Sequence, residues 1–286
     1  MLHCRLFVRV CFSLLLSLPA WAGTVTHHSF NSPSLGRSID YNLYTPDGYE
    51  SSSQRYPVLF LLHGNLGTEH SWIERGGLKE TADKLIASGQ IPAQLIVTPR
   101  DPNFWWSDSE LEPVFTAMMT EFIPHIDDEH RTLATASARA IGGYSAGGFG
   151  AANAALRYPQ LFSVAALLSP AIYGDEPPET SSGRTTPVFM DGGEFSRKKW
   201  QAASYTTWLS VYKESGNIVP FYINSGDHDR FDIAFHAAVF FQALREHQPE
   251  AVELRIFDGD HDFAAWGGSL EDAMIYMANF LAPPMP

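Results

Sequence analysis

One serine stands among five glycines in the stretch 141–150, IGGYSAGGFG. A hydroxyl can act as a nucleophile when the chain holds it at a tight turn and a neighbouring base removes its proton. The pattern Gly143-x-Ser145-x-Gly147 follows a run with strand character and precedes an alanine-rich run with helical character. Glycines two positions either side of the serine let the chain fold back tightly. The stretch therefore predicts a nucleophilic serine, Ser145, in preference to a flexible linker.

A serine nucleophile needs a base, and the base needs a carboxylate that orients it. Two late segments, NSGDHD (224–229) and DGDHDF (258–263), each follow a strand-like run and contain both residue types. Side chains at the carboxyl ends of neighbouring parallel strands emerge at the same edge of a sheet. His261 is the expected base, in the chain order nucleophile, acid, histidine. Asp227 and Asp229 both remain candidates for the acid at this point.

The negative oxygen that develops during acyl transfer needs two N–H donors, and losing one typically costs about 3 kcal/mol. The backbone N–H of Ala146, directly after the serine, is the first expected donor. The second is the N–H of Asn65, in the loop after the strand-like run LFLL (59–62). Gly64 would let that loop come close, and His63 is expected to orient the loop instead of serving as a second base.

The elements that must position these residues alternate between strand-length apolar runs and longer helical patterns, which predicts a mostly parallel sheet with helices on both faces. Two runs with alternating polarity, 24–30 and 37–44, predict an antiparallel hairpin at the sheet edge. The expected buried strands are 58–62, 95–98, 139–143, 164–168, 220–224 and 252–257. The expected helices are 78–88, 111–127, 148–158, 233–247 and 269–281.

The N-terminal segment has two arginines, an apolar run and small residues at Ala20 and Ala22, which predicts a signal peptide over residues 1–22. Residues 23–286 are then expected to form one domain, without stable membrane insertion, in the periplasm or outside the cell. Both cysteines, Cys4 and Cys11, lie in the leader. The remaining chain would have no thiol for catalysis or for zinc binding.

The charge pattern argues against some partners. The chain has a formal net charge of −13 and no cluster of lysine and arginine that could follow a phosphate backbone, so we expect no nucleic acid. Its eleven histidines show no metal-ligand spacing, so we expect neither a metal nor another cofactor. Trp105 and Trp106 follow a strand at the active edge, where they would form either a substrate platform or core packing. The irregular stretch 174–187 would form a lid, a wall of the site or a plain surface loop.

Taken together, these segments resemble the esterase D-type branch of the α/β-hydrolases, which includes S-formylglutathione hydrolases, feruloyl esterases, enterochelin esterases and mycolyltransferase antigens. The resemblance rests on YPVLFLLHGNLG, EFIPHIDDEHRT, RAIGGYSAGGFGAANAALRYPQLFSVAALLSPAI, GDHDRF and GDHDFAAW. In that family the acid stands three residues after a glycine, which implies Asp229 in preference to Asp227. The chain departs from the family pattern at NLG, after His63-Gly64, and at Ala146, where the family often has methionine. Both positions supply backbone donors, so the mechanism does not depend on their side chains.

The resemblance implies an α/β-hydrolase fold and hydrolysis of a carboxylic ester, of a small molecule or a carbohydrate, through an acyl-enzyme. Ser145 would attack, His261 would carry the proton and Asp229 would orient the histidine. One alternative is an acyltransferase with the same residues, and another is a binding protein without turnover on the same fold.

Overall fold

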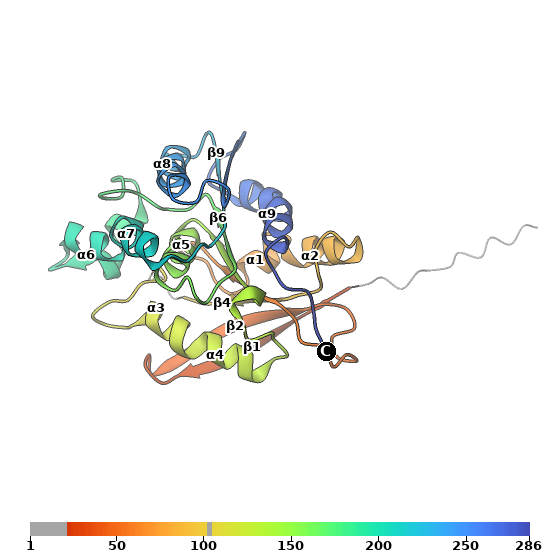
Figure 1. Cartoon of the computed structure of the whole chain (residues 1–286). Helices are drawn as coiled ribbons and strands as arrows, with labels where there is room; N and C mark the ends of the chain where they lie inside the picture. The colour runs from red at the N-terminus through yellow and green to blue at the C-terminus, as the bar shows by residue number, and fades with distance from the viewer. Residues whose placement is uncertain (1–21, 102–104) are drawn as a thin grey trace, which may run out of the picture.

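The computed structural model describes residues 22–101 and 105–286. The predicted leader, residues 1–22, therefore lies outside the described residues except for its last position. An eight-stranded sheet with the order β1-β2-β4-β3-β5-β6-β9-β10 forms the centre of the molecule (Figure 1). Its strands are β1 (Thr24–Ser32), β2 (Arg37–Thr45), β3 (Val58–Leu62), β4 (Leu95–Pro99), β5 (Arg139–Tyr144), β6 (Val164–Leu168), β9 (Phe221–Gly226) and β10 (Val252–Phe257).

The strands pair as the polarity patterns predict. β1 and β2 form an antiparallel hairpin at one edge, and β2 also pairs antiparallel with β4. All remaining neighbours in the sheet, from β4 to β10, run parallel. The central strands β3, β5 and β6 are buried along their whole length, which explains their unbroken apolar or small-residue sequences. The mostly parallel sheet expected from the sequence is confirmed.

Helices cover both faces of this sheet (Figure 1). One face packs against the long helical run 114–129 and against α5, α7 and α8, and the other packs against α1, α2 and α9. The bounds are α1 (Ser71–Glu74), α2 (Leu78–Ala87), α3 (Val114–Ala117), η1 (Met118–Phe122), α4 (Ile123–Glu129), α5 (Ala146–Arg157), α6 (Arg197–Ala203), α7 (Tyr205–Ser215), α8 (Ile233–Arg245) and α9 (Phe263–Ala278). No helix in the described ranges is long and apolar enough to cross a bilayer.

Two helical regions differ from the expectation. α9 begins at Phe263, six residues before the expected start, because the side chain of Asp262 caps it by accepting the N–H of Ala265 at 3.1 Å. The run expected over 111–127 begins at Val114 and widens to a π-helical turn, η1. Pro124 is the second residue of α4, just after this turn, and its missing N–H explains why the regular helical ladder is interrupted there.

The region between β6 and β9 contains two helices that the sequence patterns did not predict. Ser196 caps the N-terminus of α6, because its side chain accepts the N–H of Lys199, and Gly216 caps the C-terminus of α7 in the left-handed conformation. A third apolar cluster, centred on the fully buried Trp200, joins this region to the start of α5. Trp200 anchors α6 in that cluster, whereas α7 buries Tyr205 and Tyr212 in the core on the α5 side of the sheet.

Candidate active site

Ser145 occupies the turn that joins β5 to α5. Its backbone has φ 53° and ψ −120°, a conformation that costs energy for a residue with a side chain. Two hydrogen bonds hold it: its N–H donates to the carbonyl of Leu168 at 3.0 Å, and its carbonyl accepts the N–H of Ala171 at 2.9 Å. The turn therefore presents the serine side chain at the carboxyl edge of the sheet in a fixed orientation.

Tight backbone contacts explain the glycines around this turn. A Cβ on Gly147 would lie 2.5 Å from the carbonyl oxygen of Leu62, and one on Gly143 would lie 2.5 Å from the carbonyl carbon of Gly147. Both distances are shorter than any ordinary van der Waals contact. The glycines thus serve close packing between β3, β5 and α5, as the pentapeptide pattern predicts.

The three residues predicted to meet do meet in the structure. The Nε2 atom of His261 lies 2.9 Å from the Oγ atom of Ser145, and its Nδ1 atom lies 2.7 Å from Oδ2 of Asp229. The carboxylate can only accept, so the imidazole carries its proton on Nδ1 and leaves Nε2 free to accept the serine hydroxyl proton. The side chains of His261 and Asp229 are 7% and 0% exposed, so water competes little for these bonds.

The geometry also distinguishes between the two candidate acids. Asp229 uses Oδ1 to accept the N–H of Phe231 at 3.0 Å and presents Oδ2 to the imidazole. The side chain of Asp227 is 47% exposed, pairs with His228 and accepts the N–H of Gly259 at 3.2 Å. Asp227 therefore holds the turn between the two late loops and does not touch His261.

Asp260 and Arg230 join the loop that carries the acid to the loop that carries the histidine. Asp260 accepts the backbone N–H of His261 at 2.6 Å and that of Arg230 at 3.2 Å. The guanidinium of Arg230 donates to Asp260 at 3.0 Å and to the carbonyl of His261 at 2.8 Å. The backbone hydrogen bond from His261, more than the nearby arginine, lowers the pKa of Asp260. These bonds fix the loops relative to one another.

Aromatic rings hold the imidazole on both sides. The ring of Phe231 meets it edge to face at a centroid distance of 4.9 Å, and the ring of Trp266 does so at 5.0 Å. Trp266 in turn stacks on Tyr144 at 4.2 Å, directly before the serine. The imidazole therefore has little room to rotate away from the line between Ser145 and Asp229.

The two expected oxyanion donors flank the serine. Ala146 is the first residue of α5, where backbone N–H groups have no partner within the helix. Asn65 lies in the turn 64–67 and lines the same pocket as Ser145. A Cβ on Gly64 would lie 2.5 Å from the ring of Tyr144 and 3.0 Å from the Cβ of Ser145, so this loop packs directly against the serine turn.

His63 fixes the loop 64–67 through hydrogen bonds that involve both of its ring nitrogens. Its Nε2 accepts the backbone N–H of Asp101 at 3.0 Å, so Nδ1 carries the proton and donates to the carbonyl of Gly64 at 2.7 Å. Burial is the main reason why the pKa of His63 is lowered to about 4; the hydrogen bond to Gly64 opposes this shift and the positive charge of Arg100 adds to it. A neutral histidine with both ring nitrogens engaged orients the loop and has no nitrogen free to act as a second base.

A pocket of about 440 Å³ opens in front of the serine. Aromatic rings and hydroxyls line it, together with two arginines, of which Arg75 stacks over the ring of Phe263 at 4.1 Å. Thr180 and Ser182 contribute one side, so the irregular segment 174–187 forms a wall of the pocket. The lining residues are Asn65, Leu66, Gly67, Arg75, Tyr144, Ser145, Thr180, Ser182, Arg230, Phe231, His261, Asp262, Phe263 and Trp266.

The suggested substrate platform, Trp105 and Trp106, is not part of this pocket. Trp105 is 2% exposed and Trp106 is 4% exposed, so both pack in the interior. The indole N–H of Trp106 donates to the carbonyl of His63 at 2.9 Å, and Trp105 lies among Phe149, Phe189 and Trp200 in the third apolar cluster. The packing alternative is therefore the correct one, because the chain turns both indoles under the active edge.

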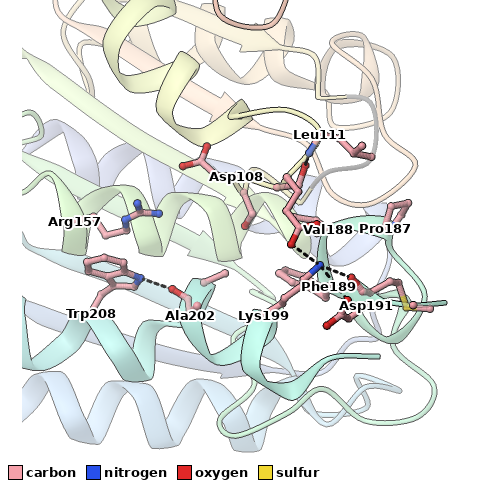
Figure 2. A pocket seen from close by; sticks show the side chains of 16 residues that line it. Asp108, Leu111, Arg157, Pro187, Val188, Phe189, Asp191, Lys199, Ala202 and Trp208 are labelled. Carbon is pink, nitrogen blue, oxygen red and sulfur yellow. Dashed lines mark hydrogen bonds and ion pairs between the residues drawn. The ribbon is translucent and has the colours of Figure 1, made fainter. Parts of the chain in front are cut away.

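Figure 2 shows a second cavity, of about 580 Å³. None of the residues that line it also lines the pocket at Ser145. Lys199 sits in it with Glu110 at 3.2 Å and the carbonyl of Met190 at 2.8 Å. Arg157 stacks on the ring of Trp208 at 4.4 Å, and burial lowers the pKa of this guanidinium. The cavity holds cations in contact with rings and carboxylates, but no nucleophile with a base.

Two clusters within the described residues have the spacing of metal ligands: His27, Glu69 and His70, and the exposed group Asp227, His228 and Asp258. In the first cluster the side-chain amide of Asn42 donates to Nδ1 of His70 at 3.0 Å. The proton of His70 must therefore sit on Nε2, which donates to Glu69 at 3.0 Å. The Nε2 proton of His70 is therefore used by Oε1 of Glu69, whose other oxygen, Oε2, is buried 3.6 Å from Arg100. Neither cluster lines the pocket at Ser145.

Comparisons with known proteins show the family and the fold of the chain. A family model described as "Putative esterase" matches residues 32–277. The chain is 34% identical over 166 residues, 54% of its length, to an endo-1,4-beta-xylanase/feruloyl esterase of Xylanibacter ruminicola. It is 30% identical over 141 residues, 46% of its length, to an esterase of Mycobacterium tuberculosis. A solved ferulic acid esterase has a TM-score of 0.77 and 25% identity, with 91% of this chain and 100% of that chain covered.

The curated relatives are longer proteins. The matches cover 22% of the Xylanibacter protein and 29% of the mycobacterial one, so the chain spans less than a third of the length of either. The family model, in contrast, covers most of this chain, and the structural match covers nearly all of it. The chain belongs to the esterase family that this model describes, and its fold is the α/β-hydrolase fold.

Proposed function

We propose that the chain is a serine esterase that hydrolyses a carboxylic ester in two steps through an acyl-enzyme. The observation that carries the proposal is the position of His261, which bonds to Ser145 on one side and to the buried Asp229 on the other. In the first step Ser145 Oγ attacks the ester carbonyl while Nε2 of His261 takes the hydroxyl proton. Asp229 holds the imidazole in the tautomer that can accept this proton and stabilises the imidazolium that results.

The carbonyl oxygen becomes negative as the serine attacks. The backbone N–H groups of Ala146 and Asn65 are the donors that would bind it, and the N-terminus of α5 adds the positive end of a helix dipole. His261 then returns the proton to the leaving alcohol. In the second step the imidazole takes a proton from water while the water attacks the acyl carbon. The imidazolium then donates that proton to Ser145 Oγ as the acid leaves, which regenerates the free serine.

The pocket supports a substrate with an aromatic or sugar ring. Phe231, Phe263 and Trp266 supply ring surfaces, and Thr180 and Ser182 supply hydroxyls that can bind polar groups. The names of the Xylanibacter relative and of the solved ferulic acid esterase point in the same direction. We therefore propose an ester of an aromatic acid or of a decorated carbohydrate, encountered in the periplasm or outside the cell after removal of residues 1–22.

A rate comparison with two chromogenic substrates tests the proposal. The purified protein is expected to hydrolyse 4-nitrophenyl acetate and a 4-nitrophenyl ester of ferulic acid, and Ser145→Ala is expected to lose at least about 10³-fold in kcat. Ser51→Ala, at an exposed serine, serves as the matched control and should retain the parent rate. Equal rates for the parent and Ser145→Ala would refute the proposed nucleophile.

A further inference from the structure

β10 lies at the end of the sheet, and only one of its two sides is paired. The carbonyls of Ala251 and Phe257 accept hydrogen bonds from Phe221 and Asp227, on the β9 side. Backbone groups alternate along a strand, so residues 251, 253, 255 and 257 direct their N–H and C=O toward β9. Val252, Leu254 and Ile256 therefore direct theirs outward. Within the described ranges no strand pairs with this outer side.

The outer side of β10 is also open in space. A groove of about 790 Å³ lies beside the strand, between it and the first turns of α9. Ile256 is 45% exposed, although it belongs to a strand that continues the central sheet. Open edge strands with unpaired backbone groups are templates for pairing with another chain, and proteins normally cover or interrupt them.

We propose that two copies of this chain form a dimer in which their β10 strands pair antiparallel about a two-fold axis at Leu254. Opposite residues in an antiparallel pair must both direct their backbone groups toward the partner or both away from it. Centring the pair on Leu254 satisfies this rule along the strand. Leu254 lies opposite Leu254 of the second copy, and Val252 lies opposite Ile256 of the second copy, all as hydrogen-bonded pairs.

The side chains select this register over its neighbours. With the axis at Leu254, Glu253 lies opposite Arg255 of the second copy, and Arg255 lies opposite its Glu253. These are non-hydrogen-bonded pairs, in which side chains come closest, so opposite charges contribute most there. Moving the axis to Glu253 or to Arg255 would place like charges directly opposite each other. The sequence of β10, VELRIF, is thus complementary to itself in one register.

On the face of β10 that carries Glu253 and Arg255, ion pairs within one chain already hold the charged side chains. Arg255 binds Glu253 at 2.5 Å and Asp272 of α9 at 2.6 Å, and all three side chains are partly exposed. A second copy would add a further carboxylate to each arginine without burying an unpaired charge. On the other face, Val252 and Leu254 already pack against the core, and a second copy would cover the exposed Ile256. The strand can therefore accept its own copy on both faces.

Two single variants that reverse the charge at position 253 or at position 255, measured separately and as a mixture, test the register. Sedimentation velocity of the purified protein across a concentration series at about 0.15 M salt should show a monomer–dimer equilibrium. Glu253→Lys places two like-charge pairs in the dimer, as does Arg255→Glu, and each should raise the dimer Kd at least about tenfold. An equimolar mixture of the two variants should recover the parent affinity, because each charge then meets its opposite. Glu246→Lys, at an exposed residue beyond α8, carries the same charge change and should dimerise like the parent.

Several results would overturn the proposal. If the parent protein stays monomeric at every concentration, the proposed dimer is refuted, and the charges of β10 would instead keep this edge unpaired. A dimer that both single variants leave unchanged would place the interface elsewhere. If circular dichroism shows that both variants are folded but their equimolar mixture does not recover the parent affinity, the register at Leu254 is refuted. Ester hydrolysis is measured in the same samples, so loss of the dimer is distinguished from absence of the proposed activity.

Discussion

Replacing Asp229 by asparagine tests the catalytic arrangement more sharply than removing its side chain. In the parent, Oδ1 accepts the N–H of Phe231 at 3.0 Å and Oδ2 lies 2.7 Å from Nδ1 of His261. A backbone N–H can only donate, so the amide oxygen of the introduced asparagine must stay at the Oδ1 position. The amide nitrogen then faces the imidazole and donates to Nδ1, which moves the ring proton to Nε2. That nitrogen can no longer accept the proton of Ser145.

The expected loss in kcat for Asp229→Asn is roughly 10⁴-fold. This factor corresponds to about 5.4 kcal/mol of transition-state stabilisation. The assay is steady-state hydrolysis of 4-nitrophenyl acetate at neutral pH. Asp227→Asn is the matched control, because Asp227 is half-exposed and does not reach the ring, and it should stay within about twofold of the parent. A larger loss for Asp227→Asn than for Asp229→Asn would refute the assignment of the acid.

Two further predictions concern folding stability, measured as the free energy of unfolding in urea. Gly147→Ala places a Cβ against the carbonyl of Leu62 and should lower the free energy of unfolding by about 1–3 kcal/mol. The control Gly268→Ala, in a helix with open space around it, should raise that free energy by up to about 1 kcal/mol. Equal free energies of unfolding for the two variants would contradict the packing argument. Burial lowers the pKa of His63 from 6.5 to about 4, so between these pH values the unfolded chain binds a proton that the folded chain does not. The contribution of His63 to the stability should be constant above pH 6.5 and fall by up to roughly 3 kcal/mol as the pH drops to 4, so His63→Gln should lose less stability than the parent over the same range.

Much of the sheet could be predicted because its strands carry strong local signals. The strands 58–62, 164–168 and 252–257 have the bounds expected from their sequences, although 252–257 is an edge strand that is only partly buried. The helices α6 and α7 could not be predicted in the same way, since tertiary packing stabilises them more than any pattern of their own. α6 packs through Trp200, and α7 packs through Tyr205 and Tyr212 on the α5 side of the sheet. Their local signals were present, in the cap at Ser196 and the left-handed Gly216, but such residues also occur in ordinary loops.

The sequence was sufficient to predict which loops form the candidate site, but not the direction of every side chain on them. The order of serine, acid and histidine, and the fold that brings strand ends together, led to Ser145 and His261. Sequence proximity alone could not separate Asp229 from Asp227, because the choice depends on which side chain the turn directs inward. For the same reason the sequence could not show whether Trp105 and Trp106 point into the pocket or into the core. Trp105 and Trp106 follow a strand at the right edge of the sheet, but the chain turns both rings into the core.

The wall formed by residues 174–187 has a consequence for the diversity of enzymes built on this fold. Arg184 braces the segment through Glu176 and the carbonyl of Pro177, so the wall is held by bonds within itself. Thr180 and Ser182 face the pocket from this wall, whereas Ser145, Asp229 and His261 project from the central sheet. Under the proposed mechanism, exchange of the segment would change which acyl group is accepted and would leave the bonds between Ser145, His261 and Asp229 intact, so selectivity and turnover could evolve as separate traits.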